Sequence, residues 1–182
     1  MTRAPLLLAA ATAALFAAVP VSAALQVGDH VPSLITQGAL AGRTINLNLQ
    51  QELRKGPVVL YFFPKAFTPG CSAEAKAFAE SIDEFKAAGA QVFGLSGDKL
   101  EDLEQFSLKD CAGAFPVAMA SPSTIQAFDV AFAMNGQRND ALSNRTSYVI
   151  AQDGRIVMVH SDLNWQDHVA TTLAAVRALH RS

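Results

Sequence analysis

Cysteine and charge are both scarce in this sequence. Only two cysteines occur in 182 residues, which excludes a small disulfide-stapled scaffold and a four-cysteine zinc site. Charged residues make up 16% of the chain, below the roughly 25% of an average soluble protein. The 14 basic and 16 acidic residues nearly balance, so the sequence predicts no strongly positive surface for nucleic acid. The length suits one domain with a core of its own.

A long apolar run lies at the N-terminus. Arg3 precedes residues 4–19, which are mostly alanine and leucine, and Val21-Ser22-Ala23 follows soon after. This order predicts a secretory signal peptide, residues 1–23, cut after Ala23 or Ala24. A membrane anchor is the alternative, but the run is shorter than the ~20 residues that span a bilayer. We therefore expect a mature domain of residues 24–182 that is periplasmic or secreted and not bound to the membrane.

The first half of the mature chain predicts two buried strands with a helix between them. Residues 58–63 form a continuous apolar and aromatic run, typical of a central strand buried on both faces. Residues 91–96 form a second such strand. The helix begins near Cys71 and ends at Gly89. Its apolar stripe has helical spacing and consists of Ala75, Phe78, Ile82 and Phe85.

The second half adds shorter elements. Asp98 with Glu101 predicts an N-terminal cap for a helix from residue 99 to about 108. Residues 115–119 predict a short strand, and Ser121-Pro122 predicts the start of a brief helix.

The chain closes with a predicted hairpin and helix. Residues 146–151 and 155–160 are expected as strands joined by a tight turn, and Asn164 as the cap of the last helix. Turn residues in 27–48 predict an irregular opening with a small hairpin. This order of elements favours a thioredoxin-like α/β fold, with a central mixed sheet flanked by helices.

Cys71 is the candidate nucleophile, because it lies in the first turn of a helix just after a buried strand. Unpaired N–H groups there carry roughly half a positive charge, which favours a thiolate. Thr68, on the same loop, can turn its hydroxyl toward the sulfur. Pro64 has no N–H, so its ring can shield the sulfur from water without competing for it. The four histidines are scattered and show no spacing typical of a metal site.

The stretch around this cysteine resembles a known family. Pro64-x-x-x-Thr68-x-x-Cys71 after an aromatic strand is similar to the active-site signature of peroxiredoxins. Thr68-Pro69-Gly70-Cys71 with Glu74 resembles the Q-type, or bacterioferritin-comigratory, subgroup of the alkyl hydroperoxide reductase/thiol-specific antioxidant family. The likeness covers nearly the whole mature chain. Its further motifs are Ser96-Gly97-Asp98, Phe115-Pro116 and the run from Asn144 to Ile150.

The resemblance implies a thiol peroxidase that needs no metal, haem or flavin. Cys71 would attack hydrogen peroxide or an organic hydroperoxide and become a sulfenic acid. Arg145 would stabilise the thiolate and the developing oxygen charge, and Thr68 would position the peroxide. Glu74 would order the loop by hydrogen bonding. A thioredoxin-like reductant of unknown identity would regenerate the enzyme, which we expect to be a monomer.

The second cysteine leaves several interpretations open. The subgroup often has a partner cysteine five residues after the reactive one, but Lys76 stands there. Other members carry it on the helix after the second strand, near Ser107, and Cys111 lies about one turn further on. We expect Cys111 to be remote from Cys71, so a disulfide, which needs Cα atoms about 4.4–6.8 Å apart, requires local unwinding.

Three alternatives remain at this point. Cys111 is a buried apolar filler in a one-cysteine enzyme. Or the two cysteines form a static cross-link in a non-catalytic module. Or the protein is a thiol oxidoreductase that acts on partner proteins.

Overall fold

The computed structural model describes residues 25–179, which contain both strands and helices. The predicted signal peptide, residues 1–23, lies outside the described residues. The strands are β1 (Ile35–Leu40), β2 (Arg43–Asn48), β3 (Val58–Phe62), β4 (Gln91–Ser96), β5 (Val117–Met119), β6 (Ala131–Met134), β7 (Gln137–Ser143), β8 (Thr146–Ile150) and β9 (Ile156–Ser161). The helices are α1 (Leu49–Leu53), α2 (Pro69–Glu80), α3 (Ile82–Ala87), α4 (Leu100–Lys109), α5 (Pro122–Ala127) and α6 (His168–Leu179).

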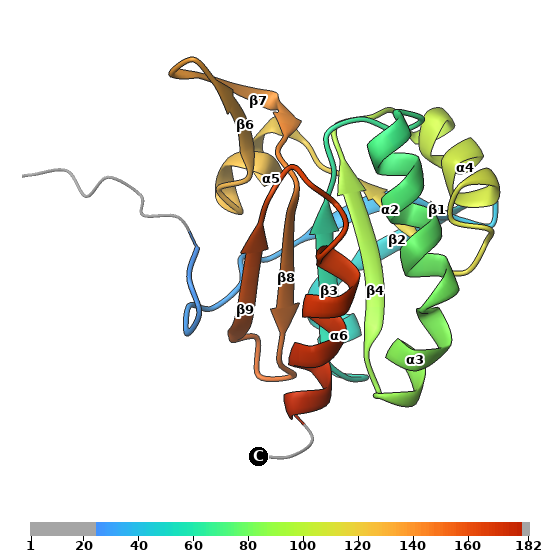
Figure 1. Cartoon of the computed structure of the whole chain (residues 1–182), viewed down its shortest axis with the longest axis vertical. Coiled ribbons are helices and arrows are strands. Elements are labelled where there is room, and N and C mark those ends of the chain that lie inside the picture. The colour runs from blue at the N-terminus through green and yellow to red at the C-terminus, as the bar shows by residue number, and fades with distance from the viewer. Residues whose placement is uncertain (1–24, 180–182) are drawn as a thin grey trace, which may run out of the picture.

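Seven strands form one mixed sheet in the order β2-β1-β5-β4-β3-β8-β9 (Figure 1). The central strands β3, β4 and β5 are parallel, and the outer strands pair antiparallel. Because parallel strands end at the same edge, the loops after β3 and β4 meet there. The predicted thioredoxin-like arrangement is confirmed.

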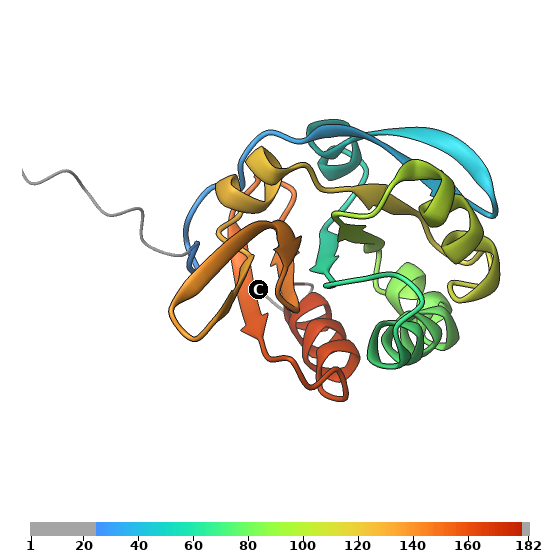
Figure 2. The same ribbon diagram turned by 90° about the horizontal axis from the view of Figure 1, so that it is seen from above.

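Helices cover both faces of this sheet (Figure 2). On one face α2, α3, α4 and α6 pack into a cluster that includes Tyr61 and Phe78. On the other face α1 and α5 pack into a cluster that includes Leu49 and Phe62. Successive β3 side chains point to opposite faces, so this strand contributes to both clusters. That double burial explains its continuous apolar run.

A second, two-stranded sheet of β6 and β7 was not predicted from the sequence. β7 is mostly exposed and polar, and β6 is a run of only four apolar residues whose last two are exposed. Neither strand therefore shows the alternating apolar pattern of a half-buried strand. Asn135 and Gly136 turn the chain with φ of 52° and 76°. Two positive φ values suit a tight hairpin turn, and the Asn-Gly pair was the available signal.

Two expected helix boundaries were wrong. The single helix predicted from Cys71 to Gly89 is two helices, broken at Ser81, whose ψ is 1°. Asn164 does not cap the last helix, which begins at His168. The Asn164 side chain accepts instead from Gln166 N at 3.2 Å, within the turn before the helix. Local hydrogen bonds of this kind compete with helix starts. Among residues 25–179, no helix is both long and apolar enough to cross a bilayer.

Candidate active site

Cys71 lies in the first turn of α2, at the edge of the sheet where β3 ends. Pro69 is the first helical residue, and Ser72 N donates to the Thr68 carbonyl as the first helical hydrogen bond. The N–H groups ahead of Ser72 therefore have no partner within the helix, and their partial positive charge surrounds the sulfur. The Cys71 side chain is only 1% exposed.

Arg145 immediately precedes β8, and its side chain reaches Cys71. Its Nη2 lies 3.5 Å from Cys71 Sγ, and its Nε donates to the Leu163 carbonyl at 2.9 Å. A Cβ on Gly70 would lie 3.3 Å from the same Nη2. Glycine at this position therefore leaves room for the guanidinium beside the helix start. Arg145 is 5% exposed, so water competes little for its donors.

Glu74 binds the other side of the guanidinium. Its Oε2 accepts a hydrogen bond from Arg145 Nη1, and its side chain is fully buried. Burial raises the pKa of Glu74 to about 7, against the opposing effect of Arg145. From the sequence, Glu74 is expected to order the loop. Its hydrogen bond goes to Arg145 instead, because residues three apart on a helix share one face and Cys71 already meets Arg145 there.

The loop between β3 and α2 is held by Asp98, which follows β4. Its Oδ2 accepts from Ala66 N at 2.7 Å and from Ser96 Oγ at 2.9 Å, and its Oδ1 accepts from Lys65. The predicted capping role of Asp98 was wrong, because Lys99 occupies the N-cap position of α4. Parallel pairing of β3 with β4 brings the two loops together, so the carboxylate finds loop donors rather than helix donors.

Thr68 and Pro64 lie on this loop without a hydrogen bond to the sulfur. Thr68 Oγ1 donates to the Lys65 carbonyl at 2.9 Å, so its hydroxyl meets any further partner as an acceptor. Pro64 is half-buried at the end of β3. Phe67 has a φ of +63°, a strained value for a large side chain, and its ring makes a T-shaped contact with Phe106 at 5.4 Å between centroids.

Comparison with known proteins decides the family. A model of the AhpC/TSA family matches residues 27–159. Peroxiredoxin Bcp of Escherichia coli is 34% identical over 148 residues, which cover 79% of this chain and 90% of that protein. The chain belongs to the AhpC/TSA family. It is a peroxiredoxin, and the predicted class of enzyme, a thiol-dependent peroxidase, is confirmed.

Further relatives agree with the predicted Q-type subgroup of peroxiredoxins. Chloroplastic peroxiredoxin Q of Sedum lineare is 30% identical over 139 residues, covering 76% of this chain and 71% of that one. The crystal structure of peroxidoxin BcpB from Mycobacterium tuberculosis matches with a TM-score of 0.75 at 28% identity, covering 85% of this chain and 98% of that one. Peroxiredoxin Q of Xanthomonas campestris matches with a TM-score of 0.67 at 29% identity, covering 78% and 89%.

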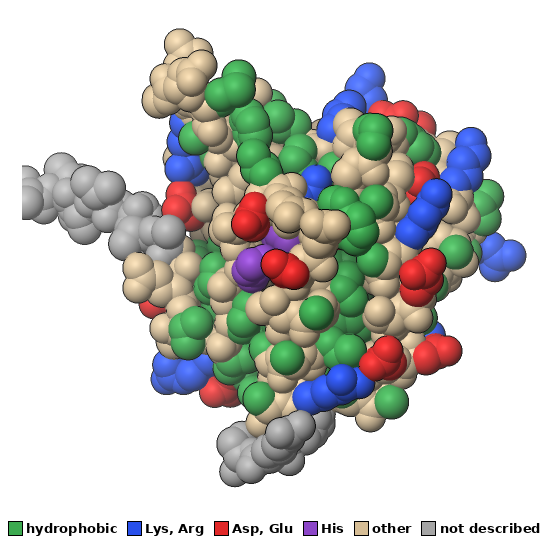
Figure 3. All heavy atoms as spheres, in the orientation of Figure 1, with side chains coloured by type: hydrophobic (Ala, Val, Ile, Leu, Met, Phe, Trp, Pro, Cys, Tyr) green, Lys and Arg blue, Asp and Glu red, His purple; other side chains and the backbone are tan. Residues whose placement is uncertain are grey.

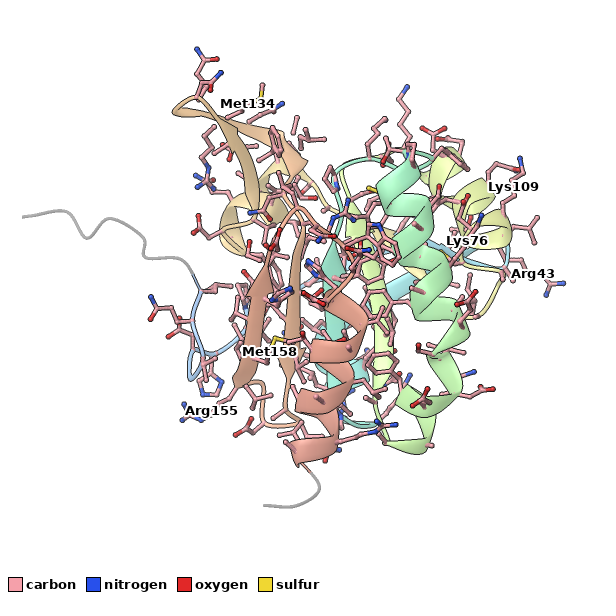
Figure 4. The ribbon with its side chains drawn as sticks, viewed as in Figure 1. Arg43, Lys76, Lys109, Met134, Arg155 and Met158 are labelled. Atoms are coloured by element: carbon pink, nitrogen blue, oxygen red, sulfur yellow. The ribbon has the colours of Figure 1, made fainter. Side chains whose placement is uncertain are left out.

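The second cysteine of this peroxiredoxin lies on another element than the first. Cys111 follows the C-terminal end of α4, a helix of 10 residues, whereas Cys71 lies in the first turn of α2, and both belong to one buried cluster. Both cysteines are buried and free. Burial raises the pKa of the Cys111 thiol. Lys76, at the position of the subgroup's common partner cysteine, is exposed on α2 (Figure 4).

Two residues near the peroxiredoxin site were not selected from the sequence. Ser147, on β8, and His168, the first residue of α6, are both fully buried. Their side chains are hydrogen-bonded at 2.8 Å, and His168 Nδ1 lies 3.7 Å from Glu74 Oε1. A serine in an apolar strand and a histidine on an apolar helix face are signals in the sequence that a buried polar contact exists. Neither residue has a local pattern that indicates which partner it contacts.

Asp98→Asn should weaken the loop that carries Thr68. The amide keeps the shape but has a single acceptor oxygen, so Ala66 N, Ser96 Oγ and Lys65 cannot all keep their bonds. We expect a loss of about 1–3 kcal/mol in unfolding free energy and slower oxidation of Cys71. Denaturant unfolding and the rate of peroxide reaction measure these effects.

Glu101→Gln is the matched control for this prediction, because Glu101 is exposed on α4. It should change neither quantity. Equal stability of Asp98→Asn and the parent protein would show that the carboxylate does not hold the loop.

Proposed function

We propose that this peroxiredoxin reduces hydrogen peroxide and organic hydroperoxides at Cys71, through a sulfenic acid that Cys111 resolves. The observation that carries the proposal is the 3.5 Å approach of Arg145 Nη2 to Cys71 Sγ at a helix N-terminus. A guanidinium and unpaired N–H groups beside one sulfur favour the thiolate, which is the attacking form of cysteine.

In the first step the thiolate attacks one oxygen of the hydroperoxide. An S–O bond forms and the O–O bond breaks, so sulfur is oxidised to sulfenic acid while the peroxide is reduced. The leaving oxygen takes a proton from solvent and departs as water or an alcohol. Arg145 donates to the developing oxygen charge, as a preorganised donor does in an oxyanion hole. Alkyl peroxide reduction activity is attributed to one relative of solved structure, the bacterioferritin comigratory protein of Xanthomonas campestris.

Thr68 would position the peroxide in this step. Its hydroxyl hydrogen is used on the Lys65 carbonyl, so Oγ1 remains free to accept a hydrogen bond from the O–H of the substrate. Pro64 would shield the sulfur from bulk water. Arg145 would donate a hydrogen bond to the hydroperoxide, and Thr68 would accept one from its O–H group. These two contacts would fix which oxygen of the hydroperoxide faces the sulfur.

Resolution would join Cys71 to Cys111 after local unwinding. The Cys111 thiolate attacks the sulfenic sulfur, an S–S bond forms, and hydroxide leaves and becomes water. Unwinding the first turn of α2 is supported by the positive φ of Phe67, because moving this loop relieves a strained residue. Opening the end of α4 would also bring Cys111 toward water, where its thiol ionises more easily.

Intact mass after one equivalent of hydrogen peroxide tests this route. Wild type should lose the mass of two hydrogens, as an intramolecular disulfide forms. Cys111→Ser should gain the mass of one oxygen and react with a sulfenic-acid trap.

Thr124→Ser, a change at a half-buried residue of α5, serves as the control and should behave as wild type. A stable sulfenic acid in wild type would show a one-cysteine enzyme. A mixed disulfide with a partner protein in place of peroxide reduction would favour the thiol oxidoreductase alternative. The static cross-link is disfavoured, because both cysteines are free.

The reductant and the setting are further parts of the proposal. A thioredoxin-like dithiol would reduce the disulfide, in line with the family. The N-terminal sequence supports a periplasmic or secreted enzyme, free of the membrane after cleavage of the signal peptide. We propose a monomer, because Cys71, Arg145 and Glu74 all belong to one chain and the proposed site needs no residue from a second copy. Size-exclusion chromatography tests the monomeric state, and N-terminal sequencing of the exported protein tests cleavage of the signal peptide.

A further inference from the structure

Glu74 has one oxygen in use and one without a partner. Oε2 accepts from Arg145, whereas Oε1 is buried and has no hydrogen-bond partner among the residues that the structure describes. An unpartnered carboxylate oxygen in the interior is costly. On the α6 side, His168 can carry a proton, and its Nδ1 lies 3.7 Å from Oε1.

The hydrogen bonds of His168 determine where its proton lies. Nε2 lies 2.9 Å from the Asp162 carbonyl, which only accepts, so Nε2 carries the hydrogen. Burial lowers the pKa of His168 to about 4, so the ring is neutral near pH 7. Nδ1 is therefore an acceptor, and the Ser147 hydroxyl donates to it at 2.8 Å. His168 in this state offers no donor to Glu74.

The remaining groups around this carboxyl are few. Cys71 belongs to the same helix, Arg145 precedes β8, and the Tyr61 hydroxyl on β3 is close enough to be affected by the charge of Glu74. His160 on β9 stacks edge-on against His168, with ring centroids 4.5 Å apart. Figure 3 shows histidine side chains between acidic ones on the face over β9 and α6. Arg145 is thus the one described cation bonded to Glu74, and it also contacts the sulfur.

We infer that His168 and Ser147 are positioning residues for the peroxidase reaction, which decide whether Glu74 competes with Cys71 for the charge of Arg145. The inference rests on the proposed role of Cys71. A neutral His168 with its lone pair occupied by Ser147 withholds a donor from Glu74 and so favours the protonated carboxyl. Protonated Glu74 leaves the charge of Arg145 to the sulfur and the peroxide.

The pH dependence of the reaction follows from this competition. Glu74 ionises as the pH rises through about 7. Its negative charge then compensates Arg145, and the stabilisation of the thiolate and of the transition state decreases. The rate constant for Cys71 oxidation should therefore show an inflection near pH 7 and fall on its alkaline side.

The test measures oxidation of Cys71 from about pH 5 to about pH 9 in a Cys111→Ser background. Trp165 is the single tryptophan of the chain, and its ring lies 3.8 Å from a Cβ placed on Gly70. Its fluorescence therefore reports on the start of α2 during rapid mixing with hydrogen peroxide. Alkylation of Cys71 by iodoacetamide over the same pH range provides a readout that needs no peroxide.

The variants should move the inflection in opposite directions. His168→Asn places an amide N–H near Glu74 Oε1, which helps the carboxylate, so the inflection should move down by about one pH unit, a tenfold change in proton affinity. Ser147→Ala frees Nδ1 to accept from protonated Glu74, so the inflection should move up. Glu74→Gln should abolish it.

Thr172→Val is the matched control. Thr172 is buried one turn after His168, and its hydroxyl donates to the His168 carbonyl rather than to Glu74. The inflection in the pH profile of Thr172→Val should therefore stay near pH 7. If His168 had only a structural role, His168→Asn and Ser147→Ala would change the oxidation rate, but they would not move the inflection pH in opposite directions.

Unmoved inflections in His168→Asn and Ser147→Ala, or an inflection that survives Glu74→Gln, would overturn the inference. Absence of any reaction of Cys71 with peroxide would instead refute the proposed function. The alkylation profiles would still decide the inference in that case.

Discussion

Cys71→Ser should abolish hydroperoxide reduction, with a loss on the order of a thousandfold or more. A serine hydroxyl stays protonated near neutral pH, and peroxide does not oxidise it to an equivalent of sulfenic acid. Peroxide consumption in the presence of a small dithiol measures the effect. Serine is close in size to the buried cysteine, so the fold should be kept, as circular dichroism and thermal unfolding will show.

Cys111→Ser separates this loss from a general effect of removing a thiol. With a small dithiol that reduces sulfenic acid directly, Cys111→Ser should retain the first oxidation step at the wild-type rate. Turnover by Cys71→Ser at the wild-type rate would remove Cys71 from the reaction. Loss of the oxidation step in Cys111→Ser would reverse the assignment of the two cysteines.

Arg145→Met should have the second largest effect, on both rate and stability. Removal of one donor from a preorganised anion site costs about a hundredfold to a thousandfold in rate. The variant also leaves Glu74 buried without its cation, and breaking a buried ion pair costs about 3 kcal/mol. Rapid-mixing kinetics and denaturant unfolding at several pH values measure the two effects.

The stability loss of Arg145→Met should grow as the pH rises. Without Arg145, which lowers it, the pKa of Glu74 in the folded state lies even further above its value in the unfolded chain. The folded state then binds more protons than the unfolded state, so stability falls with rising pH above the unfolded pKa of about 4.3. The loss should be small near pH 5 and large near pH 8.

The double variant Arg145→Met/Glu74→Gln distinguishes the two roles of the arginine. Removing the carboxylate should restore most of the stability and cancel its pH dependence, because no buried charge remains unpaired. The rate should stay low, because the sulfur still lacks its donor. Recovery of the rate in the double variant would show that Arg145 serves only to neutralise Glu74.

The position of Cys71 at a helix start was readable from the sequence because its causes are local. A buried apolar strand, a loop with Pro64 and Thr68, and a helix start at Pro69 are all contained in one short segment. The same holds for α5, which starts at Pro122 as expected from Ser121-Pro122; the structure adds that Ser121 Oγ accepts from Thr124 N. Where the signal was local but weak, as in the short strand β6 and the polar strand β7, the element was missed.

Asp98 shows how a local pattern misleads when tertiary structure offers a better partner. Asp98 with Glu101 has the spacing of a helix cap, yet the carboxylate bonds to Ala66 N on the loop after β3. The parallel pairing of β3 and β4 creates that partner, and no residue near Asp98 in the sequence indicates it.

The amino-acid sequence alone determined the strand, the loop and the helix start that present Cys71, since short-range sterics and hydrogen bonding decide them. The tertiary structure decided what surrounds the sulfur. Arg145 lies 74 residues away along the chain and reaches Cys71 and Glu74 only because β8 pairs with β3. His168 meets Glu74 only because α6 packs beside α2. Electrostatic control of a buried group depends on charges and donors within a few ångströms, and folding alone brings these together.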